Sequence, residues 1–561
     1  MGISRDKIRW NGWGWAAHKD GVGAREDVWR WLAGELGMPS LLVTPARGMD
    51  EITLAAPRLE RRDCEKFVAM LGADQMRDDT YERAFHALGR SYHDLLRLRA
   101  GDLASAPDAV LYPSGTDEVL AVLAYASERN IAVVPYGGGT SVVGGVSANA
   151  GPFGAVVALD LSRMDRLIDV DSLSRTATAE AGIYGPALEK ALQARNATLG
   201  HYPQSFEFST LGGWIAHRGA GQQSLRYGKA EDWLISAKLA TPRGLLITPD
   251  IPASAAGPNL RDLVVGSEGV FGVIAEATVR IQPVPEAAEF RGYLFRDFTS
   301  GTAAIRRAMQ EDLGTAMLRL SDAEETRFFR AYGAAGKSGG LKSRLESAYL
   351  RWRKFADEAC LMIAGFEGSM GAVAQSRARF EQIARALGAL SLGSNPGARW
   401  RAGRFHGPYL RDPMMDRGLG VDTLETAASW SRLDALYAAV RSALETAIAA
   451  TVPRPGARGI VMCHISHSYA DGASLYFTCI FPRALDGEIA QWKKIKAAAS
   501  EAIVAQGATI SHHHGVGEDH LPWITQEKGE LGIEVLRAIK GTLDPKGILN
   551  PGKLIPPQMP A

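Results

Sequence analysis

The chain has 561 residues, 46% of them apolar, which suffices for more than one buried core because single cores stop growing at roughly 250–300 residues. Its 63 Lys and Arg against 62 Asp and Glu leave a formal charge of +1, so no whole-molecule field attracts nucleic acid. The polar start MGISRDKIRW and the lack of a run of ~18 apolar residues argue against a secretory signal and a membrane span. Four widely spaced cysteines fit a reducing compartment. We therefore expect a cytoplasmic protein.

The first hundred residues combine a tryptophan-rich start with stretches of helical periodicity, as in RAFHALGRSYHDLLRLR at 83–99. The pattern then changes to a strand ending in VLYPS at 110–114, a helix at 116–130 with Thr116 as its N-cap, and a second strand, IAVVPY, at 131–136. Further strands are expected at VVALD, TATAE and VFGVIAEATVRIQPVP, and at GASLYFTCIF. The fold class is α+β, with a helical segment at 1–105, a cofactor domain at 106–285, a substrate or cap domain at 286–500 and a helical C-terminal segment at 501–561.

The segment PYGGGTSVVGG, residues 135–145, follows directly on an apolar strand. Glycines there let the main chain approach a ligand and adopt positive φ, so that N–H groups converge on a phosphate. Residues 137–142 lack the third glycine of GxGxxG, and Gly145 stands where a P-loop needs its lysine. A nicotinamide Rossmann site and an NTPase are therefore disfavoured.

The glycine segment resembles the pyrophosphate loop of the vanillyl-alcohol-oxidase or PCMH type of FAD-binding domain. Three further segments agree with that type in the right order: FSTLGGWIA at 208–216, VVGSEGVFGVIAEATVRI at 264–281 and DPKGILNPGK at 544–553. The first segment predicts a helix that begins with small residues, and the unpaired N–H groups at such a helix start favour an anion or a carbonyl-rich ring. Relatives that tether FAD covalently through the loop often carry a histidine after the glycines. Thr140 stands there, so noncovalent FAD is expected.

The resemblance implies a set of FAD-contacting positions. They are Pro135, Tyr136, Gly137, Gly138, Gly139, Thr140, Ser141, Gly144, Gln204, Ser205, Ser209, Thr210, Gly212, Gly213, Trp214, Arg218, Glu268, Gly269, Gly272, Val273, Ile274 and Asn550. Arg218, with Arg226 and Lys229, could also add positive charge near the loop.

More of the chain resembles one family of this type, the alkyldihydroxyacetonephosphate synthases, which make the ether bond of ether lipids. The likeness runs through IRWNGWGW at 8–15, GHYPQSFEFSTLGGWIAHRGAG at 200–221, YLRDPMMDRGLGVDTLETAASW at 409–430, SYADGASLYF at 468–477 and SHHHGVG at 511–517. It implies acyl-dihydroxyacetone phosphate and a long-chain fatty alcohol as substrates, and a homodimer. The implied reaction exchanges acyl chain for alcohol through a flavin N5 adduct without net redox change.

The resemblance implies that the substrate proton is handled by Tyr469 and by the run His512, His513 and His514. If that run is extended, the first and third imidazoles share a face and the second points oppositely. A base tuned near working pH and an enolate-stabilising group are what abstraction beside a ketone requires. The alternative for Tyr469 is a purely structural role as a half-buried tyrosine in a strand. No metal site is expected, because adjacent histidines rarely converge on one ion and no acidic or Cys cluster accompanies them.

The resemblance assigns Arg319 and Arg411 to recognition of the substrate anion, and guanidinium groups suit a phosphate dianion. Surface or ion-pair roles are the alternative for both. Residues 337–355 mix basic and apolar side chains as an interfacial helix would, or as a solvated amphipathic helix does. Peripheral membrane contact is one expectation for this segment.

Two departures from the family pattern leave room for a changed substrate. Gln204 stands where the family usually has an acidic residue, and the aromatic strand is trimmed to LYFTCIF. The main rival is an FAD-dependent 2-hydroxyacid oxidase or dehydrogenase of the glycolate or D-lactate type, which shares the flavin module and the DPKGILNPGK ending. A flavin-binding protein with a degenerate substrate site is a second rival.

Overall fold

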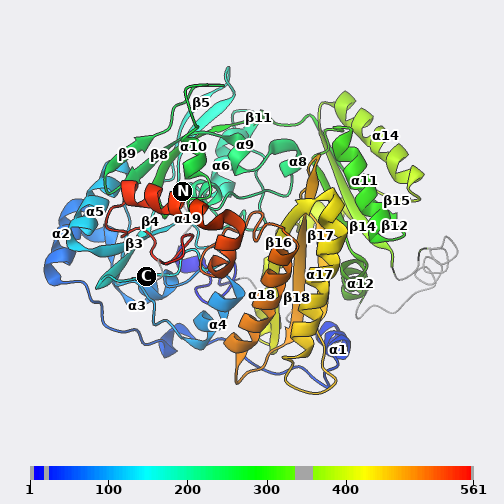
Figure 1. Cartoon of the computed structure of the whole chain (residues 1–561), viewed down its shortest axis with the longest axis horizontal. Helices are drawn as coiled ribbons and strands as arrows, with labels where there is room; N and C mark the ends of the chain where they lie inside the picture. Colours follow the sequence, from blue (N-terminus) through cyan, green and yellow to red (C-terminus); the bar gives the residue numbers. More distant parts are fainter. Residues whose placement is uncertain (1–4, 18–24, 335–354, 356–357, 558–561) are drawn as a thin grey trace.

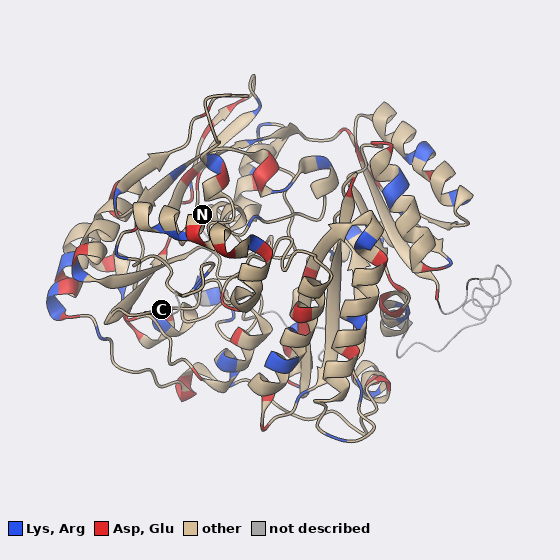
Figure 2. Cartoon of the chain, viewed as in Figure 1, with Lys and Arg blue, Asp and Glu red and all other residues tan. Residues whose placement is uncertain are grey.

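The computed structural model describes residues 5–17, 25–334, 355 and 358–557. The two halves of the molecule lie side by side, one built on two small sheets and the other on one large sheet (Figure 1). Basic and acidic residues are interspersed over both halves (Figure 2). Among the described residues, no helix has both the length and the apolar composition to cross a bilayer.

The first small sheet carries the glycine loop. Its order is β1 (Met76–Arg77), β2 (Ala109–Leu111), β4 (Ala155–Asp160) and β3 (Ile131–Tyr136), with β2 and β3 parallel to β4. Helix α5 (Thr116–Arg129) joins β2 to β3, which confirms the predicted strand, helix, strand unit. Its N-cap is Gly115 and Thr116 is the first helical residue, so the predicted cap was wrong by one position.

The second small sheet is antiparallel and shares a buried core with the first. Its order is β5 (Leu167–Asp171), β6 (Thr176–Glu180), β10 (Val273–Arg280), β8 (Leu234–Thr241) and β9 (Gly244–Ile247). A two-stranded pair, β7 (Ala197–Thr198) and β11 (Gln282–Pro283), lies beside it. The helices between β6 and β10 are α6 (Gly185–Gln193), α7 (Leu211–Ala216), α8 (Ser224–Tyr227), α9 (Ala230–Trp233) and α10 (Arg261–Val264).

The other half is a seven-stranded antiparallel sheet. Its order is β15 (Leu390–Gly393), β12 (Ala287–Phe295), β14 (Cys360–Gly368), β13 (Met317–Ser321), β17 (Ile460–Ile465), β18 (Gly472–Pro482) and β16 (Leu419–Ser429). Helices α11 (Phe298–Gln310), α14 (Met370–Ala386), α17 (Trp430–Ala449) and α18 (Glu488–Ala505) pack on one face (Figure 1).

Alternation along these strands decides which side chains meet the helices. Leu318, Leu320 and Phe477 belong to the core beneath the helices. Because successive strand residues point to opposite faces, Arg319 and Tyr476 point to the other face. On that face lie α12 (Ala323–Ala334), α15 (Asn395–Gly403), the 3₁₀ turn Gly407–Leu410 and α16 (Arg411–Met415).

Both ends of the chain return to the glycine loop. The N-terminal region contains α1 (Glu26–Glu35), α2 (Arg61–Leu71), α3 (Thr80–Phe85) and α4 (Tyr92–Ala100). The periodic stretch 83–99 therefore forms two helices, separated by a loop in which Arg90 donates its N–H to the Ser141 carbonyl at 2.6 Å. After α19 (Ile524–Leu543), Leu549 forms a parallel bridge with Val133 of β3.

Candidate functional site

The glycine loop leaves its main chain open. Among the described residues, the N–H groups of residues 138–142 have no hydrogen-bond acceptor, although buried N–H groups are almost always paired. A Cβ at Gly138 would lie 1.8 Å from the Phe208 carbonyl oxygen, and Gly139 has φ of +68°. Both positions therefore require glycine, and the unpaired donors are suited to phosphate oxygens.

A narrow cleft runs beside this loop and collects many of the predicted cofactor positions. Those that line it are Pro135, Tyr136, Gly137, Thr210, Gly212, Gly213, Glu268, Gly269, Gly272 and Ile274. Thr210 caps α7 by accepting the Gly213 N–H at 3.3 Å, so the predicted small-residue helix opening is present. His217 also lines the cleft, and nothing in the sequence pattern singled it out.

Other predicted cofactor residues support the cleft from behind. Ser141 Oγ accepts the Gly145 N–H at 2.9 Å, and Trp214 donates its indole N–H to Ser209 at 2.7 Å. Asn550 donates to the carbonyls of Gly145 and Glu268 at 3.0 and 2.7 Å. The C-terminal segment therefore ties the glycine loop to the turn before β10.

The side chains of Gln204 and Arg218 do not line this cleft. Gln204 lies at the edge of a larger cavity and donates to the Arg404 carbonyl at 3.3 Å. Arg218 has φ of +55° and pairs with Glu231 at 3.2 Å, with 56% of its side chain exposed. Six other predicted cofactor residues belong to the same segments as the lining residues but do not themselves line the cleft. They are Gly138, Gly139, Thr140, Gly144, Ser205 and Val273.

The larger cavity has a volume of about 920 Å³ and lies against the face of the large sheet opposite α11, α14, α17 and α18. One part is lined by apolar side chains, namely Leu294, Met317, Phe355, Leu361, Ile363, Leu392 and Trp400. Another part is lined by Arg319, His464, His467, Tyr476, His513 and His514. The cavity can therefore hold an apolar chain whose polar end meets imidazoles and a guanidinium.

Tyr469 and His512 form a hydrogen bond of 2.6 Å between the phenol oxygen and Nε2. Burial raises the pKa of Tyr469 above its ordinary value, so the phenol is protonated and donates. Burial and nearby Lys229 lower the pKa of His512 well below its usual range. Neither residue lines the cavity. His467 and His513 do line the cavity, and Tyr469 and His512 lie behind them. The predicted residues therefore form two layers, one at the cavity wall and one behind it.

The histidine run is not extended, so the condition for alternating side chains is not met. The N–H groups of His512, His513 and His514 all donate to the carboxylate of Glu425, at 2.7, 2.9 and 2.9 Å. Ser511 donates its hydroxyl to the same carboxylate at 2.8 Å. These bonds curl the main chain around the carboxylate, which brings His512 Nδ1 within 3.1 Å of His513 Nδ1.

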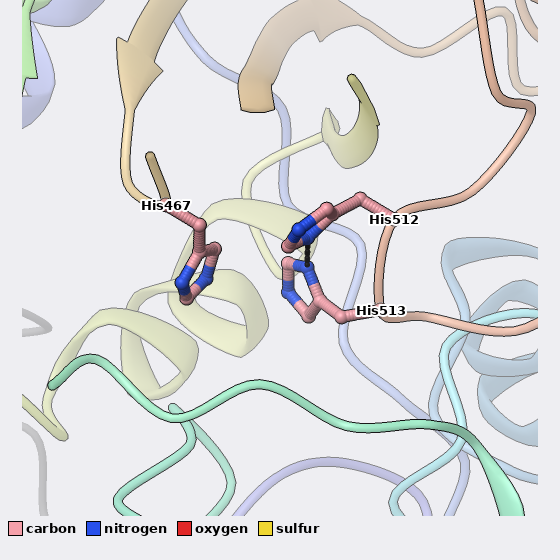
Figure 3. A group of neighbouring side chains, drawn as sticks. All are labelled: His467, His512 and His513. Atoms are coloured by element: carbon pink, nitrogen blue, oxygen red, sulfur yellow. Dashed lines mark hydrogen bonds between the residues drawn. The ribbon is translucent and has the colours of Figure 1, made fainter. Parts of the chain in front are cut away.

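Three imidazoles, those of His467, His512 and His513, lie close together in Figure 3, with one nitrogen atom from each within 4.8 Å of the others. Most of those nitrogens already have partners. His512 uses Nε2 with Tyr469 and Nδ1 with His513, and His467 Nδ1 contacts Ser224 Oγ at 2.7 Å. This arrangement is a hydrogen-bonded cluster, and a metal would have to displace its bonds.

The two predicted arginines lie in different surroundings. Arg319 lines the cavity and contacts Glu325 at 3.0 Å and His464 Nδ1 at 3.1 Å. Burial by itself raises the pKa of Glu325. The charge of Arg319 and the contact with His464 outweigh burial and hold this pKa at about 2. Arg411 does not line the cavity. It donates to the Arg90 carbonyl at 2.9 Å, in the loop that contacts the glycine segment.

Two family models match the chain. One is the FAD binding domain, over residues 107–249, and the other is the C-terminal domain of FAD linked oxidases, over residues 284–554. An alkyldihydroxyacetonephosphate synthase from Dictyostelium discoideum is 35% identical over 529 residues, covering 94% of this chain and 86% of that protein. The chain belongs to the alkyldihydroxyacetonephosphate synthase family.

Two further relatives agree over nearly the whole chain. The alkyldihydroxyacetonephosphate synthase of Trypanosoma brucei brucei is 32% identical over 581 residues, covering 98% of this chain and 93% of that protein. A solved structure of an alkyldihydroxyacetonephosphate synthase superposes with a TM-score of 0.83 at 32% identity, covering 98% of this chain and 99% of that one. The α+β fold with a PCMH-type FAD-binding domain is thereby confirmed, and the cofactor is FAD.

Sequence reasoning missed several groups that shape this family site. Glu425, His464, His467 and Glu325 contact predicted residues directly. The signal in the sequence that could have found them is the alternation of polar and apolar residues along the strands. In the structure, Tyr476 is the register partner of Glu425 on one side and of His464 on the other. A polar residue on the predicted inner face of three paired strands marks a site, but the pairing is not visible in the sequence.

Proposed function

We propose that the protein exchanges the acyl chain of acyl-dihydroxyacetone phosphate for a long-chain fatty alcohol and releases a fatty acid, giving an ether lipid precursor. One observation carries the proposal. The cavity of about 920 Å³ is lined by apolar side chains, including those of β12 and β14, and also by imidazoles and several guanidinium groups, Arg319 among them. Such a shape accepts a chain at one end and a phosphorylated ketone at the other.

A chain of hydrogen bonds leads from the cavity wall into the protein. His513 lines the cavity, its Nδ1 contacts His512 Nδ1 at 3.1 Å, and His512 Nε2 accepts from Tyr469. Burial lowers the pKa of His512 and His514 well below the usual range, so both are neutral in the resting protein, and a proton taken up there must be stabilised by nearby negative charge. We propose that this cluster removes the proton from the carbon beside the ketone. His513 and His514 lie nearest the substrate, and Tyr469 orients His512.

The phosphate and the departing carboxylate need positive charge. Arg319 lines the cavity, and Arg404 lines it near Gln204. Because a guanidinium binds phosphate through two parallel N–H donors, Arg319 is our candidate for substrate anion recognition. Arg411 is assigned an architectural role through its bond to the Arg90 carbonyl.

Bound FAD supplies an oxidised, electrophilic ring, so the exchange requires no external electron acceptor. The chain's own residues hold it through the open N–H groups of residues 138–142 and the cleft beside α7. Thr140 stands where covalently tethering relatives carry a histidine. We therefore propose noncovalent FAD, which acid precipitation tests, since the flavin then leaves with the supernatant.

A 2-hydroxyacid oxidase or dehydrogenase is the alternative from another reaction class. It would use the same histidines and Arg319 to bind a carboxylate. A hydroxyacid of a few atoms would leave most of a 920 Å³ cavity empty, although small-molecule sites usually enclose most of their ligand. The cavity size therefore favours the lipid substrate.

The proposal is tested by incubating the purified protein, without any electron acceptor, with acyl-dihydroxyacetone phosphate and a radiolabelled C16 alcohol. We expect one fatty acid released for each alcohol incorporated into an alkali-stable ether. Release of fatty acid without alcohol incorporation would overturn the exchange and indicate a hydrolase.

The cytoplasmic location and three further sequence predictions stay predictions. The four-part domain division is one, and the homodimer is another. Membrane contact by residues 337–355 is the third, and of that segment residues 337–354 lie outside the described residues. Sedimentation and vesicle flotation would test the last two.

A further inference from the structure

The carboxylate of Glu425 is the centre around which the histidine loop folds. Glu425 lies in β16, is 1% exposed, and points to the cavity face beside its register partner Tyr476. Its two oxygens accept the Ser511 hydroxyl and three consecutive N–H groups at 2.7 to 2.9 Å. Consecutive N–H groups converging on one anion form a concave main-chain nest, and here the anion is part of the protein.

A second carboxylate fixes the other end of the loop. Glu268 accepts the N–H groups of Val516 and Gly517 at 2.6 and 2.7 Å. Glu268 belongs to the cofactor half and Glu425 to the large sheet. Residues 511–517 are therefore held between the two halves, so the position of the imidazoles relative to the cofactor cleft depends on both carboxylates.

Glu425 also lies close to the imidazoles themselves. Its oxygens are 3.9, 3.5 and 3.8 Å from Nδ1 of His512, His513 and His514. At such distances, opposite charges inside a protein interact far more strongly than in water. A proton that leaves the substrate carbon and bonds to one of these imidazoles creates a positive charge next to this carboxylate.

Other charged groups also face the cluster. They include the cations Lys229, which donates to the His512 carbonyl at 2.8 Å, and Lys496 of α18, which lowers the pKa of His514. The remaining neighbours include the imidazoles of His464, His467 and His520, the phenols of Tyr469 and Tyr476, and two carboxylates, Glu231 at 3.4 Å from Lys229 and Glu268, which accepts the Val516 and Gly517 N–H groups. Among the described residues, the carboxylate bonded to the histidine main chain is that of Glu425.

We propose that Glu425 is a positioning residue for the reaction, which shapes the loop 511–514 and balances the imidazolium that forms when a histidine takes the substrate proton. The step moves one proton from carbon to nitrogen and no electrons. This inference rests on the proposed function for its kinetic part, whereas the shaping of the loop is independent of the substrate.

The test compares Glu425→Gln, Glu425→Asp and wild-type holoenzyme. Removing the negative charge makes the imidazolium less stable, so its pKa falls and the acidic limb of kcat/KM moves to lower pH. For Glu425→Gln we expect retained FAD, a loss in kcat of about 100-fold, and faster modification of His513 by diethylpyrocarbonate, read by mass spectrometry. Glu425→Asp keeps the charge and should restore the acidic limb, with a smaller loss in kcat.

The matched control is Glu367→Gln in β14. Glu367 is also buried, at 6% exposed, and accepts the Tyr227 hydroxyl at 2.7 Å. It should keep the wild-type pH profile and histidine reactivity. An unchanged acidic limb and unchanged His513 reactivity in Glu425→Gln would overturn the inference. If the wild type shows no exchange, the proposed function fails, and the diethylpyrocarbonate comparison alone decides whether Glu425 shapes the loop.

Discussion

The cofactor cleft and the substrate cavity are built from different parts of the polypeptide. The cleft is lined by many glycines and lies beside the loop whose N–H groups at residues 138–142 are open. The reactive wall of the cavity is formed by side chains from β13, β17, β18 and the loop 511–517. Changes in the cleft should therefore alter FAD retention, and changes in the cavity should alter turnover and substrate choice.

The largest effect should come from Gly138→Ala. The new Cβ would lie 1.8 Å from the Phe208 carbonyl oxygen, so main chain must move and the phosphate cradle is lost. We expect a colourless protein, measured as the flavin to protein absorbance ratio. Gly154→Ala is the control because its Cβ meets nothing within 4 Å. A yellow Gly138→Ala protein would contradict the assignment of the cleft.

On the cavity side, Tyr469→Phe and His514→Ala should keep FAD and lose turnover by about 100-fold or more. Tyr469→Phe removes the donor to His512 Nε2, and His514→Ala removes an imidazole from the cavity wall. Flavin content and the rate of alcohol incorporation are measured together. Activity near wild type in either variant would refute the role given to that residue.

A smaller effect is expected for Arg319→Lys. Lysine keeps the charge but cannot present two parallel N–H donors, so KM for acyl-dihydroxyacetone phosphate should rise about tenfold, with kcat changed less. Arg307→Lys serves as control, since Arg307 is 47% exposed and pairs with Glu311 at the surface. Equal KM values in the two variants would remove Arg319 from anion recognition.

The smallest effect should be a change in chain-length preference. Ile363 lies in β14 on the apolar part of the cavity wall. Ile363→Phe reduces the volume open to the chain, so activity with C18 relative to C12 substrates should fall several-fold, in line with ~1–3 kcal/mol for small changes in apolar fit. An unchanged ratio would place the chain elsewhere.

The same contrast explains what the sequence could predict. The glycine loop of the cofactor half could be predicted because residues 135–145 are contiguous in the sequence. Tyr469 and the histidines were found by motif, but their geometry was not, because the extended expectation for residues 512–514 ignored a carboxylate 87 residues away from His512 in sequence. Glu425 and His464 come together through the pairing of β16, β18 and β17, and Glu325 reaches His464 from α12, and a single sequence specifies neither arrangement.

The account is tested most directly by the flavin spectrum during turnover under argon. We expect ether product to form from acyl-dihydroxyacetone phosphate and fatty alcohol while the flavin is still oxidised when the substrates are exhausted, and D-lactate and glycolate to leave the spectrum unchanged. Bleaching of the flavin by either hydroxyacid, with no ether formed from the lipid substrates, would contradict it.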